Sequence, residues 1–135
     1  MLRVVLDANV ILSALLSPRG TPGRILERLI EGTVELILSP VLIGELRRSL
    51  GYPRVKRYLR LSADELETVL AQLETIADTV QGDVELSVEL RDRQDLPALA
   101  AAVEGRADYV VTGDKDLLVL AEFDGIAIML PRATE

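Results

Sequence analysis

The stretch Val4-Val5-Leu6-Asp7-Ala8-Asn9 decides the fold of this chain. Its apolar run, Val-Val-Leu, is typical of a short strand buried on both faces in the middle of a parallel sheet. The run ends abruptly at the carboxylate of Asp7. In open parallel α/β sheets, ligands bind just beyond the carboxyl ends of the strands. We therefore expect Asp7 to lie at a functional site.

Strands and helices alternate after this first strand. Further strands are predicted over residues 34–38, 109–111 and 126–129, and a strand or extended segment over 84–90. Helices are predicted over residues 10–16, 21–32, 40–50, 62–77 and 95–103, with shorter helical turns after Pro53 and Asp114. This pattern indicates an α/β fold, a three-layer α/β/α sandwich around a mostly parallel sheet of four to five strands. We expect residues 1–135 to form a single domain.

The composition excludes several kinds of site. The chain has no Cys and no His, which rules out disulfides, zinc–thiolate sites, Cys nucleophiles and Ser-His-Asp triads. A general base or metal ligand must then be Asp or Glu, or less often Lys or Tyr. Oxygen ligands alone suit Mg²⁺, Mn²⁺ or Ca²⁺.

Cations are concentrated in one part of this acidic chain. The net charge of −7 argues against nucleic-acid binding. Residues 47–60, however, contain six of the fifteen cations, with Tyr52 and Tyr58 among them. These cations are Arg47, Arg48, Arg54, Lys56, Arg57 and Arg60. Such a segment can bind a polyanion if a metal screens the carboxylates elsewhere.

The hydrophobic pattern gives no sign of membrane association. No apolar run approaches the length needed to span a bilayer. The apolar residues at the N-terminus continue directly into the first strand, without the layout of a signal peptide. We therefore expect a cytoplasmic protein with no membrane partner.

Acidic residues recur at strand ends and helix starts. Each has a simpler explanation: Asp7, Asp95 or Asp114 as a helix cap, and Glu45 or Asp92 as a solvated side chain. The sequence Asp114-Lys115-Asp116 after a Gly turn is less easily explained by capping. In a parallel sheet, strand ends and helix starts share one edge, and carboxylates gathered there repel one another. A cluster of this kind predicts a site for Mg²⁺ or Mn²⁺.

Four motifs resemble, in order and spacing, those of the PIN-domain ribonucleases, and most nearly the VapC-like toxins of bacterial and archaeal toxin–antitoxin pairs. They are Leu6-Asp7-Ala8-Asn9-Val10-Ile11-Leu12-Ser13, Ser39-Pro40 followed by Glu45-Leu46, Arg91-Asp92-x-x-Asp95, and Val111-Thr112-Gly113-Asp114-Lys115-Asp116-Leu117-Leu118. The likeness covers essentially the whole chain.

This resemblance implies an endoribonuclease that depends on Mg²⁺ or Mn²⁺. Its catalytic acids would be Asp7, Glu45, Asp95 and Asp114, and its metal ligands Asp7, Asp95 and Asp114, with Asp116 as an auxiliary acid. It also implies Thr112 or Ser13 as a hydroxyl near the metal and Asn9 as a polar partner at the site. The basic segment, in particular Arg47, Arg48, Arg54, Lys56 and Arg57, would hold the RNA backbone.

The resemblance further implies an antitoxin, a small protein that covers the acidic site, and the Leu-rich helix surfaces allow a homodimer.

One departure concerns the third motif, where Arg93, Gln94 and Leu96 stand at the third, fourth and sixth places of the usual Arg-Asp-Pro-Asp-Asp-Asn. Asp95 is kept, so the departure affects a second metal or a substrate contact rather than the first metal.

Two other functions fit the same residues. The first is a phosphatase or phosphotransfer domain with Asp7 as nucleophile and Lys115 and Asp114 as helpers, although position 9 is Asn where an Asp would be expected. The second is a non-catalytic module whose acidic cleft binds a basic peptide.

Overall fold

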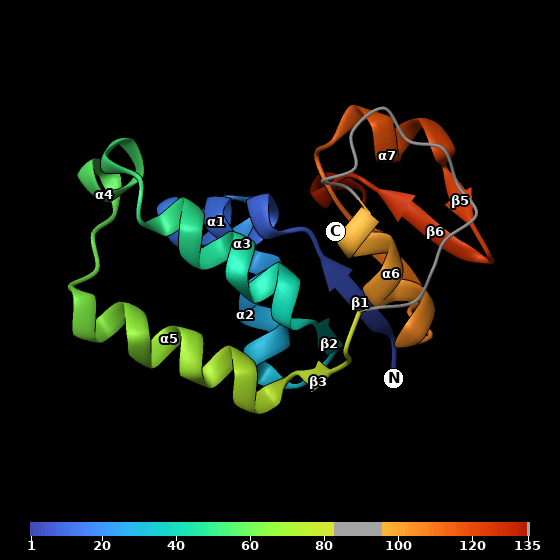
Figure 1. Ribbon diagram of the computed structural model, residues 1–135, viewed down its shortest axis with the longest axis horizontal. Helices are drawn as coiled ribbons and strands as arrows, with labels where there is room; N and C mark the ends of the chain where they lie inside the picture. The colour runs from blue at the N-terminus through green and yellow to red at the C-terminus, as the bar shows by residue number, and fades with distance from the viewer. Residues whose placement is uncertain (83–95, 135) are drawn as a thin grey trace.

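A six-stranded sheet runs through the computed structural model, which describes residues 1–82 and 96–134 (Figure 1). The strand order is β3-β2-β1-β4-β6-β5. Neighbouring strands pair in parallel, except β5 and β6, which are antiparallel. The strands are β1 (Arg3–Leu6), β2 (Glu35–Leu38), β3 (Asp78–Thr79), β4 (Tyr109–Val111), β5 (Glu122–Phe123) and β6 (Ile126–Met129).

Helices connect most of the strands, and local sequence signals explain several of their ends. They are α1 (Ala8–Leu16), α2 (Thr21–Glu31), α3 (Pro40–Leu50), α4 (Pro53–Tyr58), α5 (Ala63–Ile76), α6 (Leu96–Glu104), α7 (Lys115–Leu120) and a 3-10 helix, η2 (Pro131–Thr134). The Ser39 side chain caps α3, and Ser62 with Glu65 forms a reciprocal capping box at α5. No helix within the described ranges is long and apolar enough to cross a membrane.

The two faces of the sheet bury different sets of side chains. Val4 and Leu6 pack with residues of α1, α2, α3 and α5 on one face. Val5 packs with residues of α6 and α7 on the other. All three side chains are buried, as predicted for a central strand. The prediction of an α/β sandwich around a mostly parallel sheet is therefore confirmed.

Two short strands lie at the edges of the sheet and were not predicted. β3 and β5 have two residues each, too few to show the alternation by which strands are recognised. The helical turns expected after Pro53 are present as α4. The predicted extended segment over 84–90 lies outside the described residues, as do the motif acids Asp92 and Asp95, and α6 is described from Leu96 onward.

The strand order creates a switch point between β1 and β4. The chain leaves β1 through α1 and continues to β2, and it leaves β4 through α7 and continues to β6 on the other side. α1 and α7 pack on opposite faces of the sheet. The carboxyl ends of these two neighbouring strands thus flank the crevice in which open α/β sheets bind ligands.

Candidate active site

Asp7 and Asp114 are connected at the switch point by one buried hydroxyl. β1 and β4 pair Leu6 with Val111, so the residues that follow, Asp7 and Thr112, leave the sheet side by side. Thr112 is fully buried. Its hydroxyl donates to Oδ2 of Asp7 at 2.9 Å and accepts the N–H of Asp114 at 3.0 Å. The ends of two strands are thereby held in a defined relation.

The Asp114 carboxylate caps α7. Its Oδ1 accepts the N–H of Asp116 at 2.8 Å and that of Leu117 at 3.3 Å. The capping explanation therefore holds for Asp114, but it uses a single oxygen. Among the described residues, Oδ2 of Asp114 has no hydrogen-bond donor, so it remains available to a ligand. Asp116 lies half-buried in the first turn of the same helix.

Asp7 carries a charge that its surroundings only partly compensate. It stands at the N-cap position of α1 without a well-formed capping hydrogen bond from its side chain. Burial raises the pKa of the Asp7 carboxyl, and the nearby charge of Asp114 adds to this effect. The Thr112 hydroxyl and the N–H groups of Asn9 and Ala8 act in the opposite direction without restoring the ordinary pKa. A bound cation would supply the missing compensation, and the carboxylate oxygens here suit a hard divalent ion.

The other predicted acids that the structure describes do not form a metal-binding group with this pair. Within the described ranges, no three acidic side chains form a group that could hold a metal ion. Glu45 is half-buried in the second turn of α3, which follows β2 and packs against α1. Asp95 lies outside the described residues. Of the predicted quartet, the structure therefore brings together Asp7 and Asp114.

The polar residues predicted near the metal fall into two kinds. Asn9 and Ser13 are exposed, one helical turn apart on α1, and so lie on the same side of that helix. Thr112 was predicted as a hydroxyl at the site and as a substrate contact. Thr112 is fully buried, and its hydroxyl is hydrogen-bonded to the Asp7 carboxylate and to the N–H of Asp114.

The basic segment lies away from the paired aspartates. Figure 1 shows α4 and α7 at opposite ends of the molecule. Arg47 is engaged in ion pairs with Glu67 at 2.8 Å and Glu74 at 3.3 Å, both on α5. The remaining cations predicted to bind RNA are exposed and form no ion pair with described residues. They are Arg48, Arg54, Lys56 and Arg57.

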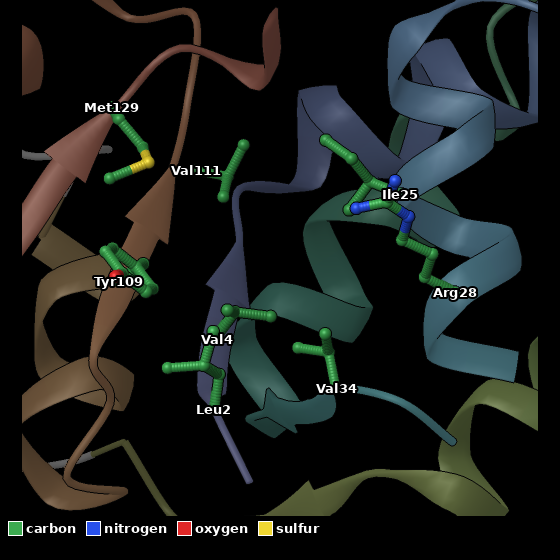
Figure 2. A pocket seen from close by; sticks show the side chains of 8 residues that line it. All are labelled: Leu2, Val4, Ile25, Arg28, Val34, Tyr109, Val111 and Met129. Carbon is green, nitrogen blue, oxygen red and sulfur yellow. The ribbon is translucent and has the colours of Figure 1, made fainter. Parts of the chain in front are cut away.

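A separate apolar hollow of about 240 Å³ lies between α2 and the strands β1, β4 and β6 (Figure 2). Seven of its eight lining residues are uncharged, and Arg28 is the exception. The lining residues are Leu2, Val4, Ile25, Arg28, Val34, Tyr109, Val111 and Met129. Because none of them is acidic, this hollow is distinct from the carboxylate site.

Comparisons with known proteins agree with this architecture. A family model described as the PIN domain matches residues 3–116. The uncharacterized protein MJ1680 of Methanocaldococcus jannaschii is 30% identical over 121 residues, which cover 90% of this chain and 76% of that protein. A chain in the crystal structure of VapBC2 from Rickettsia felis, bound to a DNA fragment from their promoter, aligns with a TM-score of 0.58. That alignment covers 94% of this chain and 97% of the other at 11% identity, so the likeness concerns the fold.

Proposed function

The chain belongs to the PIN-domain family, whose members are typically nucleases that use divalent metals, and we propose that it is a metal-dependent endoribonuclease. The observation that carries the proposal is the pairing of Asp7 and Asp114 through Thr112 at the switch point. The raised pKa of Asp7 means that its negative charge is unfavourable in the folded protein without a cation. Perturbed carboxyl groups of this kind cluster at functional sites.

Asp7 and Asp114 would hold Mg²⁺ or Mn²⁺, with Asp116 as an auxiliary ligand and Asp95 as a third carboxylate. When bound, such an ion lowers the pKa of a water molecule and neutralises charge that develops on the phosphorus oxygens. The role of Thr112 is to fix the Asp7 carboxylate, because its hydroxyl donates to Oδ2. Capping of α7 likewise fixes the rotamer of Asp114.

The remaining polar residues would act on the RNA and on the attacking water. Glu45 would position that water or accept its proton. Asn9 and Ser13, exposed on α1 next to Asp7, would contact the RNA strand beside the scissile phosphate. The reaction is hydrolysis of a phosphodiester, in which the water oxygen bonds to phosphorus and the bridging oxygen leaves with a proton.

Cleavage of a labelled RNA in Mn²⁺ tests this proposal. We expect Asp7→Asn and Asp114→Asn to lose cleavage while keeping the circular dichroism spectrum of the wild type. Asp64→Asn is the matched control, because Asp64 is exposed in the first turn of α5 and should be dispensable. Wild-type cleavage rates in both site variants would overturn the mechanism.

Metal binding can be measured without activity. If the ion binds the folded state alone, Mn²⁺ at a hundredfold excess over its dissociation constant should stabilise the wild type by about 2.7 kcal/mol. The Asp7→Asn variant should show a much smaller shift, because it lacks one of the two paired carboxylates. An equal shift in both proteins would place the ion elsewhere.

We further propose that the protein is the toxin of a toxin–antitoxin pair and binds a small antitoxin. A groove of about 540 Å³ between α1, α2 and α5 supports this proposal. Its walls are mostly apolar, including Leu15, Leu26 and Ile30, and its charged lining residues are Glu27, Glu31 and Arg60. An amphipathic peptide with basic residues would match both features.

Co-expression with the product of the neighbouring reading frame tests the partner. A stable complex should elute together on size-exclusion chromatography and should lose RNA cleavage. Replacing Ile30, 49% exposed, with Asp should release the partner without affecting cleavage by the free protein. Light scattering on the free protein measures whether it forms the expected homodimer. An Ile30→Asp protein that still elutes with the partner would exclude the groove.

A further inference from the structure

Helix α4 exposes two of the few aromatic side chains in this chain. The sequence contains three Tyr, one Phe and no Trp. Tyr52, at the N-cap of α4, is 53% exposed, and Tyr58, its last residue, is 68% exposed. Large rings are normally placed where they bury apolar surface. The two ends of this short helix therefore each present an exposed ring that a ligand can reach.

Unpaired cations lie next to both rings. Tyr52 and Lys56 are four residues apart, as are Arg54 and Tyr58, and side chains at this spacing are neighbours on a helix surface. Arg57 is also exposed. Within the part of the chain that is described, these cations form no ion pair, whereas Arg47 on α3 pairs with Glu67 and Glu74.

The packing of α4 keeps these groups directed outward. Val55 and Leu59 are half-buried against the core on the α1 side of the sheet. They anchor the helix along one side. The rings and cations occupy other positions of the helix and its cap, and all of them are exposed.

On the basis of the proposed function, we propose that α4 is a platform for single-stranded RNA, on which Tyr52 and Tyr58 stack against bases while Arg54, Lys56 and Arg57 bind phosphates. Stacking on aromatic rings combined with backbone contacts by cations is how proteins hold unpaired strands. The bases of a duplex are already stacked and are not available to a side-chain ring. In a chain of net charge −7, this cationic surface would also determine where a polyanion first binds.

Helix α3 runs between the carboxyl edge of the sheet and the platform. α3 begins directly after β2, at the carboxyl edge of the sheet, and α4 follows its far end. Eleven residues of α helix rise about 16 Å, which equals about five nucleotides at a rise of 3.4 Å per stacked base. The cleavage site and the platform therefore engage different parts of the same strand.

Binding of a fluorescein-labelled oligoadenylate of about 12 nucleotides, measured by anisotropy in EDTA, tests the platform without requiring cleavage. Tyr52→Ala and Tyr58→Ala should each weaken binding about tenfold, and the Tyr→Phe variants should bind like the wild type. The same strand annealed to its complement should bind less tightly than the single strand. Equal binding by wild type and both Ala variants would overturn the proposal.

The salt dependence of binding identifies the cations that contact phosphates. For a single strand, the slope of log K against log salt is negative, and each lost phosphate contact reduces its magnitude by about 0.7. Arg54→Gln and Arg57→Gln should each show this loss. Arg47→Gln is the matched control, since Arg47 is engaged with α5, and it should leave the slope unchanged. A loss of slope in Arg47→Gln alone would move the contact to α3.

Fluorine NMR of protein labelled with 3-fluorotyrosine locates the contact. The three tyrosines give three signals, and Tyr109, half-buried on β4, serves as internal reference. RNA should shift the signals of Tyr52 and Tyr58 and leave that of Tyr109 unchanged. If anionic phosphatidylserine vesicles produce these shifts and RNA does not, the platform is a membrane contact and the proposal is wrong.

These measurements separate the platform from the nuclease. Binding through α4 by a protein that cleaves no RNA in Mn²⁺ would leave the platform standing and remove the proposed activity. If the protein cleaves RNA in a metal-dependent way and the Tyr→Ala variants of α4 bind RNA normally, the nuclease proposal holds and the platform is excluded. If both proposals hold, the α4 variants should raise KM for long RNAs and leave kcat unchanged.

Discussion

The Thr112 hydroxyl donates a 2.9 Å hydrogen bond to Oδ2 of Asp7, although 105 positions separate the two residues in the sequence. The same hydroxyl accepts the N–H of Asp114 at 3.0 Å. A buried side chain therefore joins the first strand to the turn before α7. Because both partners are candidate metal ligands, the geometry of the site depends on a residue that does not itself face solvent.

Replacing Thr112 with Val should remove both hydrogen bonds while keeping the shape of the side chain. The N–H of Asp114 would lose its acceptor and Asp7 its donor, at a cost of about 1–3 kcal/mol in the free energy of unfolding. We expect weaker Mn²⁺ binding as well, since the Asp7 carboxylate would no longer be oriented. Urea unfolding and metal titration by calorimetry measure the two effects.

Thr112→Ser keeps the hydroxyl and removes the methyl group, so it distinguishes the contribution of one from that of the other. It should lose about 1 kcal/mol of stability through the missing buried methyl but retain the metal affinity of the wild type. A Val variant with wild-type metal affinity would show that the hydrogen bond has no part in positioning Asp7.

Asp7→Asn should stabilise the metal-free protein at neutral pH. The pKa of the Asp7 carboxyl is raised in the folded state, chiefly by burial. Ionising this carboxyl at neutral pH therefore costs the folded protein more free energy than it costs the unfolded chain. As pH falls through the raised pKa, the folded protein takes up this proton before the unfolded chain does, and its stability relative to the Asn variant increases. The advantage of Asp7→Asn should therefore shrink between neutral pH and the ordinary pKa of aspartate.

Thermal unfolding in EDTA at a series of pH values measures this difference. Asp124→Asn provides the control, because Asp124 is exposed in the turn between β5 and β6. In Mn²⁺ the order should reverse, because the wild type should gain much more stability from the ion than the variant does. An Asn variant that is less stable than the wild type in EDTA at neutral pH would contradict the expected cost of the buried charge.

Local patterns were sufficient to predict most of the architecture. The uninterrupted apolar residues of β1 predicted a strand buried on both faces, and the Ser62 to Glu65 box predicted the start of α5. β3 could not be predicted in this way, because two residues carry no periodicity. It is a strand because of its parallel pairing with β2, a relation between distant segments.

The site shows the same limit. Acids at strand ends can be predicted from the sequence, but the link between Asp7 and Thr112 depends on β4 lying next to β1, which no single segment encodes. Arg47 illustrates the converse. It belongs to a basic run in the sequence, yet its guanidinium pairs with Glu67 and Glu74, which the chain brings back on α5.

Arg3 should contribute to stability at the other end of β1. Its guanidinium contacts Asp78 at 2.7 Å, Glu35 at 3.0 Å and the carbonyl oxygen of Gly105 at 2.9 Å. The side chain is 26% exposed, so solvent screens these interactions in part. We expect Arg3→Met to lower the free energy of unfolding by about 1–2 kcal/mol.

Hydrogen exchange can show which part of the sheet loses stability in Arg3→Met. The N–H of Val80 donates to the Leu38 carbonyl oxygen at 2.8 Å, directly after β3. Its exchange should accelerate in Arg3→Met more than the exchange of core amides in β1. Arg19→Met, at an exposed loop position, is the control. Unchanged protection of Val80 would mean that Arg3 does not hold β3 in place.

Two glycines within helices should respond to Ala with opposite signs. A Cβ at Gly23 in α2 would lie 2.1 Å from the carbonyl oxygen of Pro18, a backbone atom that can move only with its loop. Gly44 in α3 has no atom within 4 Å of the position its Cβ would occupy. Gly23→Ala should therefore cost about 1–3 kcal/mol through overpacking. Gly44→Ala should gain about 0.5–1 kcal/mol by reducing the entropy of the unfolded chain.

Guanidinium unfolding at a fixed pH measures both changes on the same scale. Gly44 precedes Glu45, so the Ala variant also tests whether α3 can be stiffened without disturbing the proposed base. We expect its RNA cleavage to match that of the wild type. Gly23 lines the groove between α1, α2 and α5, and the shift of α2 that Ala requires should also weaken binding of the antitoxin. If Gly23→Ala proved as stable as Gly44→Ala, the close approach of α2 to the Pro18 loop would be wrong, and with it the shape of that groove.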